Sequence, residues 1–305
     1  MDNLGSNRQK KRMAANSTPT PGKLRLHLYD HCPYCIRVEL VLGWHGVPYE
    51  RVVYGYGDRL GDPNKADDPN CYDGGVVLTG KKELPVLESI NLETNQREWL
   101  KAESLDIISW VLFDKKVNSF SFPQKSGRED LSKFFHTKGR FKVVQRILSR
   151  GRNLKMTHLK DWAKSEDRAY AKAKYEKGGF DYDAAQQADA SSILEMQTLL
   201  EQADKELLKS NTSLNENGVF GFDDLLYLPE LRTLSLVKGL VWPERLKNYV
   251  VTSFAKAETP TYLTTKSSNT RTAKCVCVET SQAKMTRTCN KTKKRMLGET
   301  EKKIR

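Results

Sequence analysis

Two cysteines separated by two residues carry the most specific chemical signal in this sequence of 305 residues: Cys32-Pro33-Tyr34-Cys35. A thiolate rather than a thiol attacks a disulfide, so this chemistry needs a cysteine with a lowered pKa. The first cysteine of such a motif lies at a helix N-terminus, where free N–H groups and the helix dipole favour an anion. Pro33 suits the first helical turn, and Cys35 is placed to resolve a mixed disulfide. The motif predicts a redox-active dithiol with Cys32 as the nucleophile.

Metal binding is the alternative use of such a pair. A structural zinc site needs four ligands, and the remaining cysteines form no second pair with the same spacing: Cys71, Cys275, Cys277 and Cys289. An iron–sulfur cluster bridged between two chains stays open as an alternative. We expect no resident metal.

Charge and composition restrict the possible partners. The net charge of +13 arises from two segments, +4 in residues 1–23 and +9 in residues 263–305, so residues 24–262 are neutral. We therefore expect no nucleic-acid partner beyond non-specific contacts of two basic tails. No run of 18 apolar residues and no secretory signal is present, so we expect a cytoplasmic protein without a membrane partner. We also expect a monomer.

Around the dithiol, the pattern predicts a βαβ unit followed by ββα. Leu24, Leu26 and Leu28 alternate with polar residues, as in a strand with one buried face. A helix follows the dithiol and ends at Gly46. The remaining elements are strands at residues 49–54, 83–87 and 97–100, and a helix from Ser104 to about residue 116.

Residues 55–80 differ from this pattern because they are rich in glycine and aspartate, and we interpret them as a long surface loop. A calcium site is the alternative, carried by Asp58, Asp62, Asp67, Asp68 and Asp73. Their spacing fits no EF-hand loop.

The second half of the chain reads as helical to about residue 262. Predicted helices cover residues 129–148, 157–174, 184–208, 223–237 and 243–256, with Asp223 as an N-cap and Pro243 in a first turn. The predicted fold is α+β followed by all-α. Its segments are a disordered basic extension (1–23), a sheet domain (24–117) with the loop insertion (55–80), a helical domain (118–262) and a low-complexity tail (263–305).

The segment Tyr29-Asp30-His31-Cys32-Pro33-Tyr34-Cys35 resembles the active-site signature of glutaredoxins. Four further stretches resemble the two-domain glutaredoxin 2 family, which shares the glutathione transferase architecture: residues 80–87 (GKKELPVL), 102–107 (AESLDI), 223–237 (DDLLYLPELRTLSLV) and 239–243 (GLVWP). The resemblance runs from about residue 24 to about residue 262. It implies a thioredoxin-like domain followed by an all-α, glutathione-transferase-like domain.

The resemblance also implies roles for particular residues, with glutathione as co-substrate. Pro85 matches the family's cis-proline, and the backbone of Leu84 would pair with glutathione as an added strand does. Glu103 and Ser104 match the acidic-Ser pair that holds the γ-glutamyl end, although a plain helix cap remains an alternative. Tyr34 would cover the bound tripeptide, or is simply an exposed aromatic. Leu84-Pro85 is otherwise the ordinary start of an edge strand.

The resemblance implies reduction of protein disulfides and of glutathione mixed disulfides. The partners would be glutathione and disulfide-bonded or glutathionylated proteins. An omega-like glutathione transferase or dehydroascorbate reductase is an alternative enzyme. A non-catalytic interaction protein with basic tails is the third possibility, which the intact dithiol disfavours.

Overall fold

The structure is a computed structural model that describes residues 22–57, 78–113, 125–261 and 263. The chain divides into two compact units, Met1–Thr264 and Thr265–Arg305, and every described residue belongs to the first unit. The predictions for the N-terminal extension, for most of the loop at residues 55–80 and for the basic tail lie outside the described residues. So do the other four cysteines and the five aspartates of the calcium alternative.

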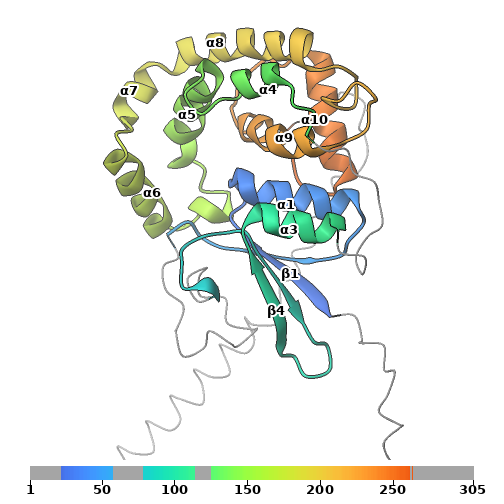
Figure 1. The fold of residues 1–305 in the computed structure, drawn as a ribbon. Coiled ribbons are helices and arrows are strands. Elements are labelled where there is room, and N and C mark those ends of the chain that lie inside the picture. Colours follow the sequence, from blue (N-terminus) through green and yellow to red (C-terminus); the bar gives the residue numbers. More distant parts are fainter. Residues whose placement is uncertain (1–21, 58–77, 114–124, 262, 264–305) are drawn as a thin grey trace, which may run out of the picture. The chain divides into compact units, whose positions relative to one another are not determined.

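Four strands form one mixed sheet in the order β2-β1-β3-β4 (Figure 1). Their bounds are Lys23–Leu28 for β1, Glu50–Val53 for β2, Val86–Ile90 for β3 and Arg97–Ala102 for β4. Strand β1 is parallel to β2 and antiparallel to β3, which in turn is antiparallel to β4. Helix α1 (Pro33–Trp44) makes the crossover that a parallel pair requires, and α3 (Ser104–Phe113) follows β4. The predicted βαβ-ββα order is confirmed.

Helix α1 is apolar around most of its circumference because it is covered on several sides. It packs against α3 and also against α9 (Phe222–Leu234) and α10 (Glu244–Lys256) of the helical domain. Ile36, Val38 and Leu40 are fully or almost fully buried in one core with residues of both domains. A Cβ atom on Gly43 would collide with the backbone of Ala257, so only glycine allows this close approach of α1 to the end of α10.

The prediction that β1 buries only one face is wrong. His27, on the face opposite Leu26 and Leu28, is as buried as they are. Its Nε2 lies 3.0 Å from Oε1 of Glu88 on β3, and Tyr54 lies 2.8 Å from its Nδ1. The buried polar residues of β1, Arg25 and His27, are thus paired with Glu50 and Glu88 of the neighbouring strands, as buried polar groups require.

The helical domain is confirmed, but three of its predicted helices are each divided. The range 129–148 holds α4 (Glu129–Phe134) and part of α5 (Arg140–Asn153), because the chain turns where Gly139 N–H donates to the carbonyl of His136 at 2.8 Å. The range 157–174 holds η2 (Lys160–Trp162) and most of α6 (Ser165–Lys177). The range 184–208 holds most of α7 (Tyr182–Gln187), then α8 (Asp189–Gln202) and η3 (Ala203–Leu207). Within the described residues, no helix has the length and apolar character needed to cross a bilayer.

Both predicted helix starts in the last part of the domain are shifted. Gly221, not Asp223, is the N-cap of α9, and Asp224 in the first turn accepts the Gly221 N–H at 2.8 Å. Pro243 is the N-cap of α10 rather than part of its first turn, because its ψ of 135° is not helical.

Candidate active site

The dithiol lies where β1 ends and α1 begins. Cys32 is the N-cap of α1 and Pro33 its first residue. The Cys32 N–H donates to the carbonyl of Tyr29 at 3.1 Å, and the Cys32 carbonyl accepts the N–H of Ile36 at 3.0 Å. Cys32 is partly exposed, whereas Cys35 is fully buried, and both are free thiols. The first cysteine therefore faces the substrate side and the second lies behind it.

The two thiols differ strongly in acidity. The pKa of Cys32 is lowered to about 7, chiefly by a hydrogen bond from the Cys35 thiol. Burial of the sulfur opposes this effect, whereas the charge of His31 and the N–H groups of Cys35 and Tyr34 add to it. Burial raises the pKa of Cys35 well above its usual value of 9.0. Near neutral pH about half of the Cys32 thiol is therefore ionised, while Cys35 keeps its proton.

The second wall of the site begins at Leu84. The Leu84–Pro85 peptide bond is cis, as the resemblance implies. The carbonyl oxygen of Leu84 lies 4.0 Å from Sγ of Cys32. This wall therefore lies within van der Waals reach of the sulfur.

Glu103 and Ser104 lie where β4 leads into α3. Glu103 has a φ of 63°, the left-handed conformation that non-glycine residues rarely adopt. Ser104 is the first residue of α3 and is nearly buried. Neither side chain makes a hydrogen bond or ion pair with another described residue, so the structure gives no capping bond to either. Both are available to a ligand.

One cavity of about 870 Å³ joins these groups. Of the predicted site residues, all but Cys35 line it: Cys32, Tyr34, Leu84, Pro85, Glu103 and Ser104. Tyr34 is 54% exposed, and the guanidinium of Arg37 lies 5.0 Å from the centre of its ring. Within the described ranges, no group of three or more His, Cys, Asp and Glu side chains is arranged to hold a metal ion.

Sequence reasoning missed the wall that the helical domain contributes. Its residues come from α5, α6 and α9, between 100 and 200 positions after the dithiol. The one signal visible in the sequence is the spacing of Lys142, Arg146 and Arg150, which puts them on one face of a helix.

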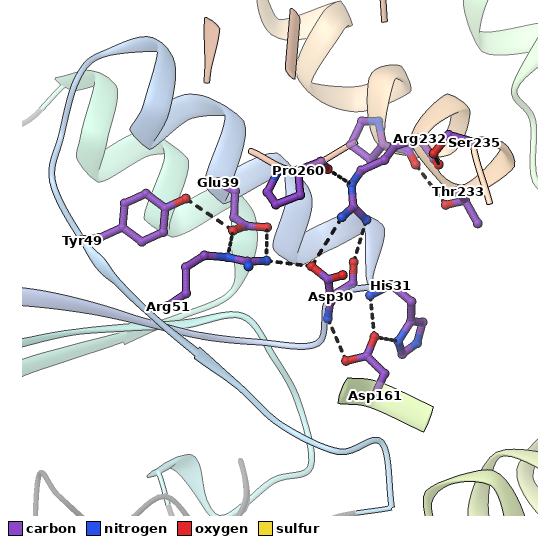
Figure 2. Close-up of polar contacts among 11 residues, drawn as sticks. Asp30, His31, Glu39, Tyr49, Arg51, Asp161, Arg232, Thr233, Ser235 and Pro260 are labelled. Carbon is purple, nitrogen blue, oxygen red and sulfur yellow. Dashed lines mark hydrogen bonds and ion pairs between the residues drawn. The ribbon is translucent and has the colours of Figure 1, made fainter. Parts of the chain in front are cut away.

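The loop before Cys32 is held by charged side chains (Figure 2). Arg232 of α9 donates to the carbonyl of Asp30 and to that of Pro260, each at 2.8 Å. Arg51 of β2 donates to the Asp30 carboxylate at 2.7 Å and to the buried Glu39 carboxylate at 2.5 Å. Asp30 is thereby fixed from both domains.

Asp161 of η2 holds the same loop from the helical domain. Its carboxylate, fully buried, accepts the backbone N–H groups of Asp30 at 2.9 Å and His31 at 2.6 Å, and lies 2.7 Å from Nδ1 of His31. The His31 ring packs against Trp162 and Tyr56. The predicted surface loop at 55–80 is therefore wrong at its start, because Tyr56 is buried in this aromatic cluster.

Replacing Asp161 with asparagine is expected to raise the pKa of Cys32 from about 7 towards 9.0. The amide removes the negative charge that holds the His31 ring, and the charge on His31 is one of the causes that lower the pKa of Cys32. The rate of Cys32 alkylation against pH measures this: the curve should move to higher pH and the rate near neutral pH should fall.

Asp167→Asn is the matched control. Asp167 is an equally buried aspartate that accepts a backbone N–H of the sheet domain, that of Gly57 at 2.7 Å, but does not contact His31. An identical alkylation curve for wild type and Asp161→Asn would show that Asp161 does not act on Cys32.

Comparisons with known proteins agree with this arrangement. Residues 26–119 match the model of the glutathione S-transferase N-terminal domain, and residues 138–265 match the glutaredoxin 2 C-terminal domain. Glutaredoxin 2 of Escherichia coli K12 is 26% identical over 231 residues, which are 74% of this chain and 92% of that protein. A crystal structure of glutaredoxin 2 from Salmonella typhimurium in complex with glutathione has a TM-score of 0.62 at 21% identity, covering 79% of this chain and 97% of the other.

Proposed function

Because the chain belongs to the glutaredoxin 2 family, we propose that it is a glutathione-dependent thiol–disulfide oxidoreductase that reduces glutathione mixed disulfides and protein disulfides. One observation carries the proposal: Cys32, with a pKa of about 7, lies at a helix N-terminus in front of the buried thiol of Cys35. The Salmonella relative was crystallised with glutathione. Two free thiols suit a reducing compartment such as the cytoplasm.

The reaction on a glutathionylated protein needs only Cys32. Its thiolate attacks the glutathione sulfur, the disulfide to the target breaks, and the target leaves as a thiolate that takes up a proton. A second glutathione thiolate then attacks the glutathione sulfur on Cys32. This releases oxidised glutathione and restores the Cys32 thiolate, so one free glutathione is consumed and its partner in the oxidised product is the glutathionyl group of the substrate.

The reaction on a protein disulfide also needs Cys35. Attack by Cys32 joins it to one target sulfur and releases the other as a thiolate. Cys35 then loses its proton and attacks Sγ of Cys32, which frees the target and forms the Cys32–Cys35 disulfide. Two glutathione molecules reduce this disulfide. A conjugating transferase would have no use for Cys35, which favours the oxidoreductase over the omega-like alternative.

We assign glutathione to the wall formed by the sheet domain. The Leu84 backbone would pair with its cysteinyl residue next to Cys32. The Glu103 carboxylate would meet the ammonium group of the γ-glutamyl end. Ser104, at the start of α3, would bind the γ-glutamyl carboxylate, since a helix N-terminus favours an anion.

A coupled assay with glutathione, glutathione reductase and a small mixed disulfide tests the proposal. The wild-type protein should turn over, and Ser104→Ala should weaken the use of glutathione by about 10- to 150-fold, the effect of losing a hydrogen bond to a charged group. Ser149→Ala is the control, because Ser149 lines the same cavity on the helical wall. No turnover by the wild type would refute the proposed function, and equal effects of both variants would refute the assignment of Ser104.

A further inference from the structure

Positive charge is concentrated in the cavity although the body of the protein is neutral. Residues 24–262 carry no net charge. The residues that line the cavity include seven lysines and arginines but only three glutamates and no aspartate. The lining therefore carries an excess of four positive charges. The proposed glutathione wall supplies none of this excess, because the charges of Lys81 and Lys82 are balanced by those of Glu83 and Glu103.

The excess comes from the wall that the helical domain contributes, together with Arg37 of α1. Lys142, Arg146 and Arg150 follow one another at intervals of four residues on α5 and all line the cavity. They form a row along one helix face that extends over about 12 Å. Arg37 of α1 and Lys174 of α6 border the same wall. Burial is the largest cause that lowers the pKa of Lys142, and the charges on Arg146 and Arg37 lower it further. Both arginines are therefore close enough to Lys142 to repel it.

A carboxylate also lines this wall, but its one negative charge does not neutralise the three positive charges of the row. Glu230 of α9 pairs with Lys142 and also accepts a hydrogen bond from Gln145 at 2.9 Å. The guanidinium of Arg150 lies 4.5 Å from the ring centre of Tyr175 and has no ion pair with another described residue. The side chain of Arg146 has neither an ion pair nor a hydrogen bond with any described residue.

The fold gains nothing from the charge at the centre of this row, that of Arg146. Like charges four residues apart on a helix destabilise it. Lys142 and Arg150 offset this through Glu230 and the Tyr175 ring, but Arg146 has no such contact with a described residue. A row of cations beside a reactive thiolate is instead suited to attract an anion and to raise its local concentration.

We propose that the cationic face of α5, centred on Arg146, binds acidic side chains that flank the disulfide of a protein substrate. Its preferred substrates are then mixed disulfides in which aspartate or glutamate lies near the reacting cysteine. This inference rests on the proposed function and adds the substrate class to it. The occupant is not glutathione itself, since glutathione is assigned to Leu84, Glu103 and Ser104, none of which lies on α5.

Three glutathione mixed disulfides test the inference. They are made from cysteine peptides that differ only in two flanking residues, which are glutamates, glutamines or lysines. The wild type should show the highest kcat/KM for the glutamate peptide and the lowest for the lysine peptide. Added salt should reduce this difference, because it screens partly exposed charges.

Arg146→Gln should lower kcat/KM for the glutamate peptide about 3- to 10-fold, leave the glutamine peptide and the KM for glutathione nearly unchanged, and not lower the melting temperature. Lys155→Gln is the matched control, because it removes one positive charge from an exposed residue that does not line the cavity. It should leave the preference intact.

Equal wild-type rates on all three peptides would overturn the inference while leaving the proposed function in place. The same loss in Lys155→Gln, or an equal loss on all three peptides in Arg146→Gln, would also overturn it. Failure of the wild type on the glutamine peptide would refute the proposed function itself.

Discussion

Replacing Cys32 with serine is expected to abolish glutathione-dependent reduction of every disulfide substrate. The Cys32 thiol, with a pKa of about 7, is about half ionised at neutral pH, whereas a serine hydroxyl stays protonated and is a poor nucleophile towards sulfur. The rate in the coupled assay should fall to the uncatalysed background. Circular dichroism and thermal unfolding should match the wild type, since the change is a single atom at a partly exposed position.

Cys35→Ser should abolish the reduction of protein disulfides but not the reduction of small glutathione mixed disulfides. Glutathione itself can release glutathione from Cys32, so turnover of small mixed disulfides should persist, while protein disulfides, which need Cys35 to free the target, should no longer be reduced. The serine hydroxyl can still donate to the Cys32 sulfur, so Cys35→Ala should raise the pKa of Cys32 more than Cys35→Ser. If Cys35→Ser were as inactive as Cys32→Ser on the small substrate, the roles of the two cysteines would be wrong.

Asp224→Ala is expected to give the largest loss of stability, about 3–5 kcal/mol. The carboxylate is fully buried and accepts five hydrogen bonds at 2.5 to 3.1 Å. The donors are the N–H groups of Leu214 and Gly221, the hydroxyls of Ser213 and Tyr249, and the side-chain amide of Asn215. Alanine leaves these donors buried and unpaired. Because a native protein is stable by only about 5–15 kcal/mol, a urea titration should show a much lower unfolding midpoint.

Asp223→Ala provides the comparison at the neighbouring position. Asp223 is equally buried, but its carboxylate accepts only the Ser126 N–H, at 3.0 Å, from the described residues. Its loss should cost about 1–2 kcal/mol. A midpoint for Asp224→Ala at or above that of Asp223→Ala would show that the five hydrogen bonds do not stabilise the start of α9.

The sheet domain and the dithiol could be predicted because their signals are local. These signals all lie within about twenty residues of one another. They are the alternation in β1, the proline at the start of α1 and the apolar residues that follow Cys35. Helix boundaries in the second half of the chain were harder to predict from the sequence. Amphipathic periodicity continues across short turns such as that at Gly139. Asp223 is an acceptable cap until the backbone shows that Gly221 is the non-helical residue.

The sequence by itself thus determined the reacting group: a cysteine at a helix N-terminus with a second thiol one turn away, since the spacing of two residues fixes that geometry within a single helix. Only the tertiary structure decided what surrounds the sulfur. Asp161, Arg232 and the row on α5 lie more than 100 residues from Cys32, and their charges act on the site only after the helical domain packs against α1. Electrostatic interactions depend on distance in space and on burial, and neither is set by separation along the chain.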